Sequence, residues 1–190
     1  MNKNLTIKQN TDLILKKSKS SLKITSNILS KRTSLIVEED DSWIQRLWDW
    51  ADNNDIPDLS RNKEKLLNLT ELWLHCNKLT ELPKEIGNLV NLTELILADN
   101  RLTQLPKEIG NLVNLPELNL YNNQLTQLPK EIGNLVNLTM LTLSDNQLTE
   151  LPKEIGNLVN LTRLTLSDNQ LTQLPKEIGN LKDNGCDITF

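Results

Sequence analysis

The sequence predicts a right-handed α/β solenoid, in which short units stack along one axis with their strands side by side. Two observations lead to this prediction. The phrase "LPKEIGNLVNL" opens four consecutive stretches, at Leu82, Leu105, Leu128 and Leu151, with a fixed step of 23 residues. Leucines in each stretch also alternate with the period of two that is typical of a β-strand. A unit this short cannot bury its own apolar face, so the step indicates stacked repeats.

The repeated region is predicted to cover residues 59–181 as five full 23-residue units and a partial sixth. Leu59 begins a degraded first copy, "LSRNKEKLLNLTELWLHCNKLTE", and Leu174 restarts the phrase as "LPKEIGNL". A unit that opens with the full phrase carries seven apolar anchors. In the unit from Leu82 these anchors are Leu82, Ile86, Leu89, Leu92, Leu95, Leu97 and Leu102.

Each unit is expected to contain one short strand and one short return turn. Leu95 and Leu97 alternate like strand residues, and identical units displaced along one axis must have parallel strands. Pro83 suits the first position of a helical turn and Gly87 suits its exit, so the return path is predicted to hold at most one turn of α- or 3₁₀-helix. One asparagine per unit is predicted to face inward and to satisfy backbone groups: Asn77, Asn100, Asn123, Asn146 and Asn169.

The second half of each unit reads L-x-x-L-x-L-x-x-N-x-L. It recurs in register at residues 69–79, 92–102, 115–125, 138–148 and 161–171. Over residues 59 to about 181 the chain therefore resembles the leucine-rich repeat family. Its P-x-E-I-G-x-L form is most similar to the bacterial cytosolic-type and Ras-group members. The resemblance implies a leucine-rich repeat solenoid, or horseshoe, with a parallel concave β-sheet and short helical or 3₁₀ turns on the convex side.

Residues 38–58 are predicted to form an amphipathic N-terminal capping helix. Six of them fall on one side at 100° per residue: Trp43, Ile44, Leu47, Trp48, Trp50 and Ala51. A solenoid needs its first unit covered, which favours a hydrophobic lid. The alternative is a tryptophan-rich helix that docks a partner, because Trp is enriched in interface hot spots.

Residues 182–190 are predicted to form an irregular C-terminal end. A step of 23 places the expected core leucines on Asn184, Asp187 and Thr189, so a sixth strand is not expected to form as the others do. Cys186, Ile188 and Phe190 alternate and offer an improvised cover. Two interpretations follow: the frame is cut short, or this poorly capped end packs against another chain, which includes self-association.

The charge is divided along the chain. Residues 1–37 hold eight Lys or Arg and one acid (net +7), whereas residues 38–190 hold 13 bases and 24 acids (net −11). Residues 1–37 are predicted to be a basic, flexible tail; the alternatives are adhesion to an anionic membrane or nucleic acid, or a secretion address. An acidic body with few aromatic residues argues against nucleic acid as the main ligand.

The sequence predicts no catalytic site, no metal site and no cofactor. His75 is the one histidine, and Cys76 beside it is its nearest metal-type neighbour, so no acid, base and nucleophile are brought together. Two distant cysteines form no disulfide framework or zinc spacing. With no apolar run long enough to cross a membrane and no signal-peptide core, we expect a cytoplasmic protein, with secretion lacking a cleavable signal as the alternative.

The residues that vary between units lie at the outward positions of the strands. By resemblance these positions line the concave surface, and we call them the concave face. One column runs Glu71, Glu94, Glu117, Met140, Arg163; a second runs Trp73, Ile96, Asn119, Thr142, Thr165; a third runs His75, Ala98, Tyr121, Ser144, Ser167. We predict a patch centred on Trp73, Ile96 and Tyr121 and flanked by three glutamates.

The function expected from the sequence is a non-catalytic scaffold for protein–protein interaction. The partner is expected to be a protein, with a basic patch that relieves the row of like charges on adjacent strands. The candidate partner-binding residues are Glu71, Trp73, His75, Glu94, Ile96, Glu117, Tyr121, Met140 and Arg163. The alternative is a secreted bacterial effector or surface factor that binds host proteins through the same face. For the patch itself, the simplest competing explanation is neutral drift on a surface that tolerates substitution.

Overall fold

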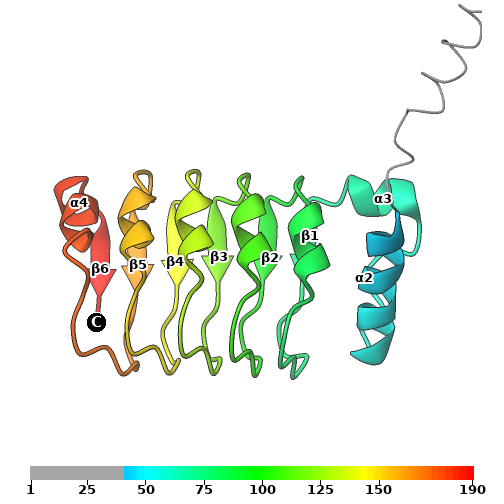
Figure 1. Cartoon of the computed structure of the whole chain (residues 1–190), viewed down its shortest axis with the longest axis horizontal. Coiled ribbons are helices and arrows are strands. Elements are labelled where there is room, and N and C mark those ends of the chain that lie inside the picture. Colours follow the sequence, from blue (N-terminus) through cyan, green and yellow to red (C-terminus); the bar gives the residue numbers. More distant parts are fainter. Residues whose placement is uncertain (1–40) are drawn as a thin grey trace, which may run out of the picture. The chain divides into compact units, whose positions relative to one another are not determined.

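The computed structural model describes residues 41–190, so the basic segment 1–37 lies outside the described residues. Six short strands form one parallel sheet in sequence order. They are β1 (Glu71–Trp73), β2 (Glu94–Ile96), β3 (Glu117–Asn119), β4 (Met140–Thr142), β5 (Arg163–Thr165) and β6 (Asp187–Thr189). Figure 1 shows these strands in one row, and the return turns in a second row beside it. The predicted solenoid with parallel strands is confirmed.

The return turns are short 3₁₀-helices of identical sequence, KEIGN. They are η1 (Lys84–Asn88), η2 (Lys107–Asn111), η3 (Lys130–Asn134) and η4 (Lys153–Asn157). Each follows an extended proline; Pro83, for example, has φ −72° and ψ 148° and precedes the turn instead of occupying its first position. The core lies between the two rows, and all seven anchors of the unit from Leu82 are buried in it.

The asparagines of the inward column form hydrogen bonds that join each unit to the one before it. Asn123 is buried, its Oδ1 accepts from Leu102 N–H at 3.0 Å, and its Nδ2 donates to Leu97 C=O at 3.0 Å and Leu120 C=O at 3.2 Å. Asn100, Asn146 and Asn169 bond in the same way. Four of the five predicted amides therefore satisfy backbone groups where the chain leaves the strand, whereas Asn77 is half-buried and its side chain donates to His75 C=O alone among the described residues.

A second asparagine column, not anticipated from the sequence, runs along the outside. Asn114 Nδ2 donates to Val90 C=O at 2.9 Å, and Asn137 Nδ2 donates to Val113 C=O at 2.8 Å. Asn91 and Asn160 do the same with the preceding unit. The second asparagine of "NLVN" thus joins consecutive units, although each of these bonds is exposed to solvent.

The glycine of each turn is required by close packing and not, as the sequence suggested, by the exit of a helix. Gly87 lies inside η1, whose last residue is Asn88. A Cβ atom on Gly87 would stand 2.4 Å from Glu108 C=O oxygen, and one on Gly133 would stand 2.4 Å from that of Glu154. Consecutive 3₁₀ turns therefore stack so closely that their contact leaves no room for a side chain.

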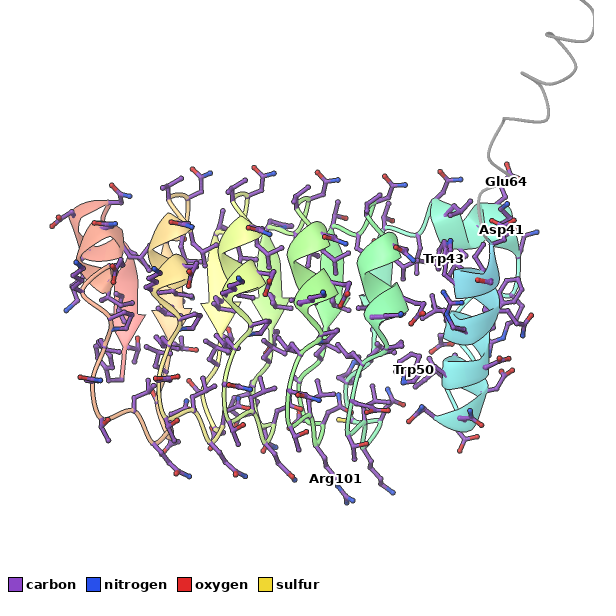
Figure 2. The ribbon with its side chains drawn as sticks, in the orientation of Figure 1. Asp41, Trp43, Trp50, Glu64 and Arg101 are labelled. Carbon is purple, nitrogen blue, oxygen red and sulfur yellow. The ribbon has the colours of Figure 1, made fainter. Side chains whose placement is uncertain are left out.

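Within residues 41–190, two helices precede the first strand: α2 (Ser42–Asn53) and α3 (Lys63–Leu67). Ile44, Leu47 and Ala51 of α2 are buried in the same core as the repeats. Figure 2 shows Trp43 and Trp50 on the side of α2 that faces the repeats, and both are partly buried against that core. The apolar side of α2 therefore covers the first unit. None of the helices in residues 41–190 has the length and apolar character needed to cross a lipid bilayer.

Residues 182–190, predicted to be irregular, include a sixth strand, which does not form in the way that the other five do. β6 pairs with β5 in parallel, with Arg163 opposite Asp187 and Leu164 opposite Ile188, so the last step is 24 residues instead of 23. The extra residue enters at α4 (Ile178–Asp183), which replaces the 3₁₀ turn of the earlier units. Ile188 thereby takes the strand position of a core leucine and packs, partly buried, against the core, and Cys186 is buried.

Candidate functional site

The parallel register aligns the predicted columns of the concave face. Glu71 lies opposite Glu94, and Trp73 lies opposite Ile96. Met140 lies between Glu117 and Arg163, on the two neighbouring strands. The structure therefore brings the strand residues of the predicted patch together, while His75 and Tyr121 follow the strands β1 and β3 in the adjoining turns.

Large apolar side chains are exposed at two positions of this face. Trp73 is 54% exposed and Tyr121 is 41% exposed, whereas Ile96 is half-buried between them. Ala98 lies in the same column as His75 and Tyr121 but is buried, so it offers no side-chain surface to a partner. The apolar part of the patch thus consists of two exposed aromatic rings and one half-buried isoleucine.

Asp145 of the next unit has the largest effect on the ionisation of the Tyr121 hydroxyl. Its negative charge raises the pKa of Tyr121 above its ordinary value, and burial, hydrogen bonding with the Asp145 side chain, and the charges of Asp99 and Asp168 add to the increase. These aspartates belong to a column that sequence reasoning left out of the candidate site. Asp99, Asp145 and Asp168 all have positive φ, near 57°, which asparagine and aspartate tolerate better than most residues.

The sequence of the repeat differs at one position beside the strands β2 and β3, and the hydrogen bonding of the sheet changes there. At the residue before the strand, the units of β1, β2, β4 and β5 have threonine, whereas the unit of β3 has Pro116. Thr93 N–H and Glu94 N–H both donate to Thr70 C=O, at 2.8 and 3.0 Å. Proline has no N–H to donate, and within residues 41–190 Thr93 C=O accepts no hydrogen bond.

The pairing of β2 and β3 is shortened as a result. Leu95 pairs with Leu118 and Ile96 with Asn119, but Glu94 does not pair with Glu117. A cavity of about 350 Å³ opens at this point. Its lining consists of Thr93, Glu94, Leu95, Ile96, Pro116, Glu117 and Asn119. Three of the candidate residues, Glu94, Ile96 and Glu117, therefore line one cavity, and nothing in the repeat pattern alone pointed to it.

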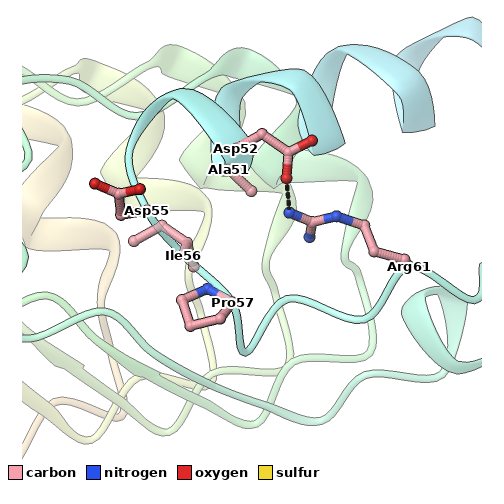
Figure 3. Close-up of a pocket in the computed structure, with 6 residues that line it drawn as sticks. All are labelled: Ala51, Asp52, Asp55, Ile56, Pro57 and Arg61. Carbon is pink, nitrogen blue, oxygen red and sulfur yellow. Dashed lines mark hydrogen bonds and ion pairs between the residues drawn. The ribbon is translucent and has the colours of Figure 1, made fainter.

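A second, open cavity of about 320 Å³ lies outside the concave face, at the end of α2 (Figure 3). Ala51, Ile56 and Pro57 form its apolar part. Figure 3 shows Asp52 bonded to Arg61, whose guanidinium also donates to Leu59 C=O at 2.6 Å. The guanidinium of Arg61 therefore already has hydrogen-bond partners within the chain.

His75 and Cys76 are both exposed after β1. Cys76 has φ 60° and is a free thiol. No group of three or more His, Cys, Asp or Glu side chains in residues 41–190 has an arrangement that could hold a metal ion. Among residues 41–190, neither side chain makes a hydrogen bond or ion pair that would orient it for nucleophilic catalysis.

Two family models match the chain. Residues 67–125 match one described as "leucine rich repeat", and residues 107–183 match one described as "leucine-rich repeat region". Together the two matches run from residue 67 to residue 183, so the chain is a leucine-rich repeat protein. Domains of this class typically bind proteins and are generally non-catalytic scaffolds. No curated protein matches the chain.

Three solved structures illustrate the likeness. An internalin of Listeria monocytogenes is 30% identical over 65% of this chain and 35% of its own, with a TM-score of 0.55. A chain of the Drosophila Toll–Spätzle complex is 35% identical over 64% of this chain and 17% of its own, with a TM-score of 0.59. A leucine-rich repeat protein of Leptospira interrogans is 40% identical over 71% of this chain and 45% of its own, with a TM-score of 0.45. The chain thus spans less than half of the length of each.

Proposed function

We propose that this protein is a scaffold that holds a protein partner on its concave face, over the strands β1 to β3. The observation that carries the proposal is the pairing of exposed Trp73 with Ile96 on the neighbouring strand, next to exposed Tyr121. Tryptophan and tyrosine bury large areas at little entropic cost and are enriched among the residues that dominate binding energy. The typical use of leucine-rich repeat domains supports this proposal.

The composition of the face changes along the stack. The column that begins with Trp73 and Ile96 continues as Asn119, Thr142 and Thr165, which are polar and half-buried. The glutamate column ends after Glu117, where Met140 and Arg163 follow. The aromatic and acidic positions thus lie together in the first three units, and we place the centre of the interface there, with Met140 and Arg163 at its edge.

Affinity capture with matched variants tests the proposal. Trp73→Ala and Tyr121→Ala remove the two exposed rings, and Val159→Ala is the control because Val159 is 56% exposed but follows η4, outside the concave face. After cross-linking and mass spectrometry, both ring variants are expected to lose the same protein while the control retains it. Capture of the same proteins by all three variants, with unchanged circular dichroism, contradicts the proposal.

The cellular address is a separate proposal. Cys76 is an exposed free thiol and Cys186 is a buried one, which supports a reducing compartment such as the cytoplasm. The alternative is a secreted bacterial effector or surface factor that uses the same face. The likeness to a Listeria internalin supports this alternative. Fractionation of the source cells separates the two, because the chain is expected in the cytosolic fraction in the first case and in the medium or envelope in the second.

A further inference from the structure

At the gap between β2 and β3, the backbone carbonyl of Thr93 accepts no hydrogen bond from the described residues, whereas the equivalent carbonyls of other units do. Thr70 C=O, Pro116 C=O and Thr139 C=O each accept two backbone N–H groups from the next unit, at 2.7–3.1 Å. Thr93 C=O accepts none within the described chain because the next unit supplies Pro116. Thr93 is exposed and lines the cavity, so this acceptor is open to a donor that a ligand brings.

The charge around this acceptor selects the kind of donor. Glu94 and Glu117 line the same cavity, and neither makes an ion pair or a side-chain hydrogen bond within residues 41–190. Like charges on adjacent strands raise the energy of the empty site. A cationic donor offsets this repulsion and also satisfies the free carbonyl, whereas an anionic donor adds to it.

The walls of the cavity suit a long aliphatic stem. Ile96 is half-buried and Pro116 is apolar, and both line the cavity together with Leu95. Lysine and arginine place their charge at the end of such a stem and bury the stem against apolar surface. A volume of about 350 Å³ is at the small end of the range of ligand pockets, which fits one side chain better than a larger molecule.

We propose that the cavity between β2 and β3 is a subsite for one lysine or arginine side chain of the protein partner, with its cationic head bonded to Thr93 C=O and the carboxylates of Glu94 and Glu117. The inference rests on the proposed function, because it names the chemistry of the partner at the centre of the same face. Pro116 is the residue that creates the subsite, since it removes the N–H that fills the acceptor in other units.

Peptide titration of the whole chain, followed by the backbone amide resonances of Thr93, Glu94 and Glu117, tests the subsite. The probes are acetyl-Gly-Gly-X-Gly-Gly-amide peptides in which X is lysine, arginine, norleucine or glutamate. The lysine and arginine peptides are expected to give saturable shifts at these amides. The norleucine peptide, which keeps the stem and lacks the charge, is expected to bind at least about tenfold more weakly, and the glutamate peptide is expected not to bind.

Three variants separate the parts of the subsite. Pro116→Thr restores the donors to Thr93 C=O and leaves both carboxylates in place, so it is expected to abolish the lysine-specific shifts while the fold is retained. Glu94→Gln and Glu117→Gln keep the gap and each weaken binding several-fold. Glu108→Gln, on η2 and away from the cavity, is the control that is expected to bind like the unaltered chain.

Equal shifts from the lysine and norleucine peptides overturn the subsite, and so does unchanged lysine binding by Pro116→Thr or by both glutamine variants. These outcomes are distinct from failure of the proposed function, because Trp73 and Tyr121 do not line the cavity. Capture that depends on the two rings without lysine binding removes the subsite alone. Lysine binding without ring-dependent capture removes the proposed aromatic interface instead.

Discussion

Arg46 of α2 bonds to Glu85 of η1, with 2.6 Å between Nε and Oε1. Glu85 is buried, whereas the equivalent glutamates Glu108, Glu131 and Glu154 are only half-buried. The helix that covers the first unit therefore encloses a carboxylate that stays partly solvated in later units, and it supplies the cation that balances the carboxylate.

Removal of this cation is expected to destabilise the N-terminal end of the stack. Arg46→Ala leaves the buried Glu85 carboxylate without its partner, which costs about 1–2 kcal/mol of unfolding free energy because Arg46 itself is half exposed. Gln45→Ala is the matched control on the same helix, since its bond to Asp49 is exposed and contributes about 0.5 kcal/mol or less. Urea denaturation of both variants checks the difference; equal midpoints contradict the role assigned to Arg46.

Alanine at two chemically identical glycines is expected to give opposite results. Gly133→Ala forces a methyl group against Glu154 C=O, and such overpacking costs about 1–3 kcal/mol or more. Gly179→Ala meets no atom within 4 Å and lies in the helix α4, so it is expected to be neutral or to stabilise by up to about 1 kcal/mol. Thermal unfolding measures both. If Gly133→Ala unfolds at the temperature of the unaltered chain, the turns do not stack as closely as described.

The asparagine column offers a comparison within one set of equivalent residues. Asn123→Ala leaves Leu102 N–H without a partner in a buried site, whereas Leu97 C=O and Leu120 C=O keep the bonds from Asn100 and Asn146. We expect a loss of about 2–3 kcal/mol. Asn77 is half-buried and its side chain donates only to His75 C=O among the described residues, so Asn77→Ala is expected to cost about 1 kcal/mol. If denaturant titrations show that Asn123→Ala and Asn77→Ala lose equal unfolding free energy, the buried asparagines do not contribute more than the half-buried Asn77.

Tyr121 provides a direct test of the acidic column, because it is the single tyrosine of the chain and its ionisation is visible in ultraviolet absorbance. The pKa of Tyr121 is expected above 10.0, chiefly because of Asp145. Asp145→Asn is expected to bring this pKa back toward its ordinary value, and Asp168→Asn, the weakest of the causes, to lower it less. A larger decrease in Asp168→Asn than in Asp145→Asn contradicts the leading effect of Asp145.

The raised pKa of Tyr121 also makes the stability of the folded chain depend on pH. The folded chain retains the Tyr121 proton to higher pH than the unfolded chain does, so the contribution is present below pH 10.0 and is lost as the pH rises through the pKa of the folded state. Denaturation midpoints should therefore decrease more steeply above pH 10.0 in the unaltered chain than in Asp145→Asn.

Much of the fold follows from the sequence because the 23-residue step imposes one geometry on every unit. Leu95, Leu97 and Asn100 are identified by period and residue type alone, and each takes its expected place. The end of the array does not follow this rule, since α4 adds one residue and thereby brings Ile188, instead of Asp187, opposite Leu164. A fixed step cannot anticipate an insertion whose effect appears only when the strand pairs.

The site was less predictable than the fold. Outward strand positions could be read from alternation, and the structure places Trp73 and Ile96 side by side as expected. The cavity depends instead on a missing hydrogen bond, and the only signal for it in the sequence is Pro116 at a position that other units fill with threonine. Tyr121 and Asp145 are 24 residues apart, so their electrostatic interaction depends on the stacking of units and not on local pattern.

The bonds between units also bear on how such an array changes length. Asn114 reaches Val90, Asn137 reaches Val113 and Asn160 reaches Val136, each across the same 24 residues of chain. Duplication or loss of a whole 23-residue segment inside this stretch restores every one of these partners, so the array can grow or shrink by recombination without a new interface. Pro116 occurs in only one of these segments, so an event that duplicates or deletes that segment changes the number of cation subsites while the stack stays intact.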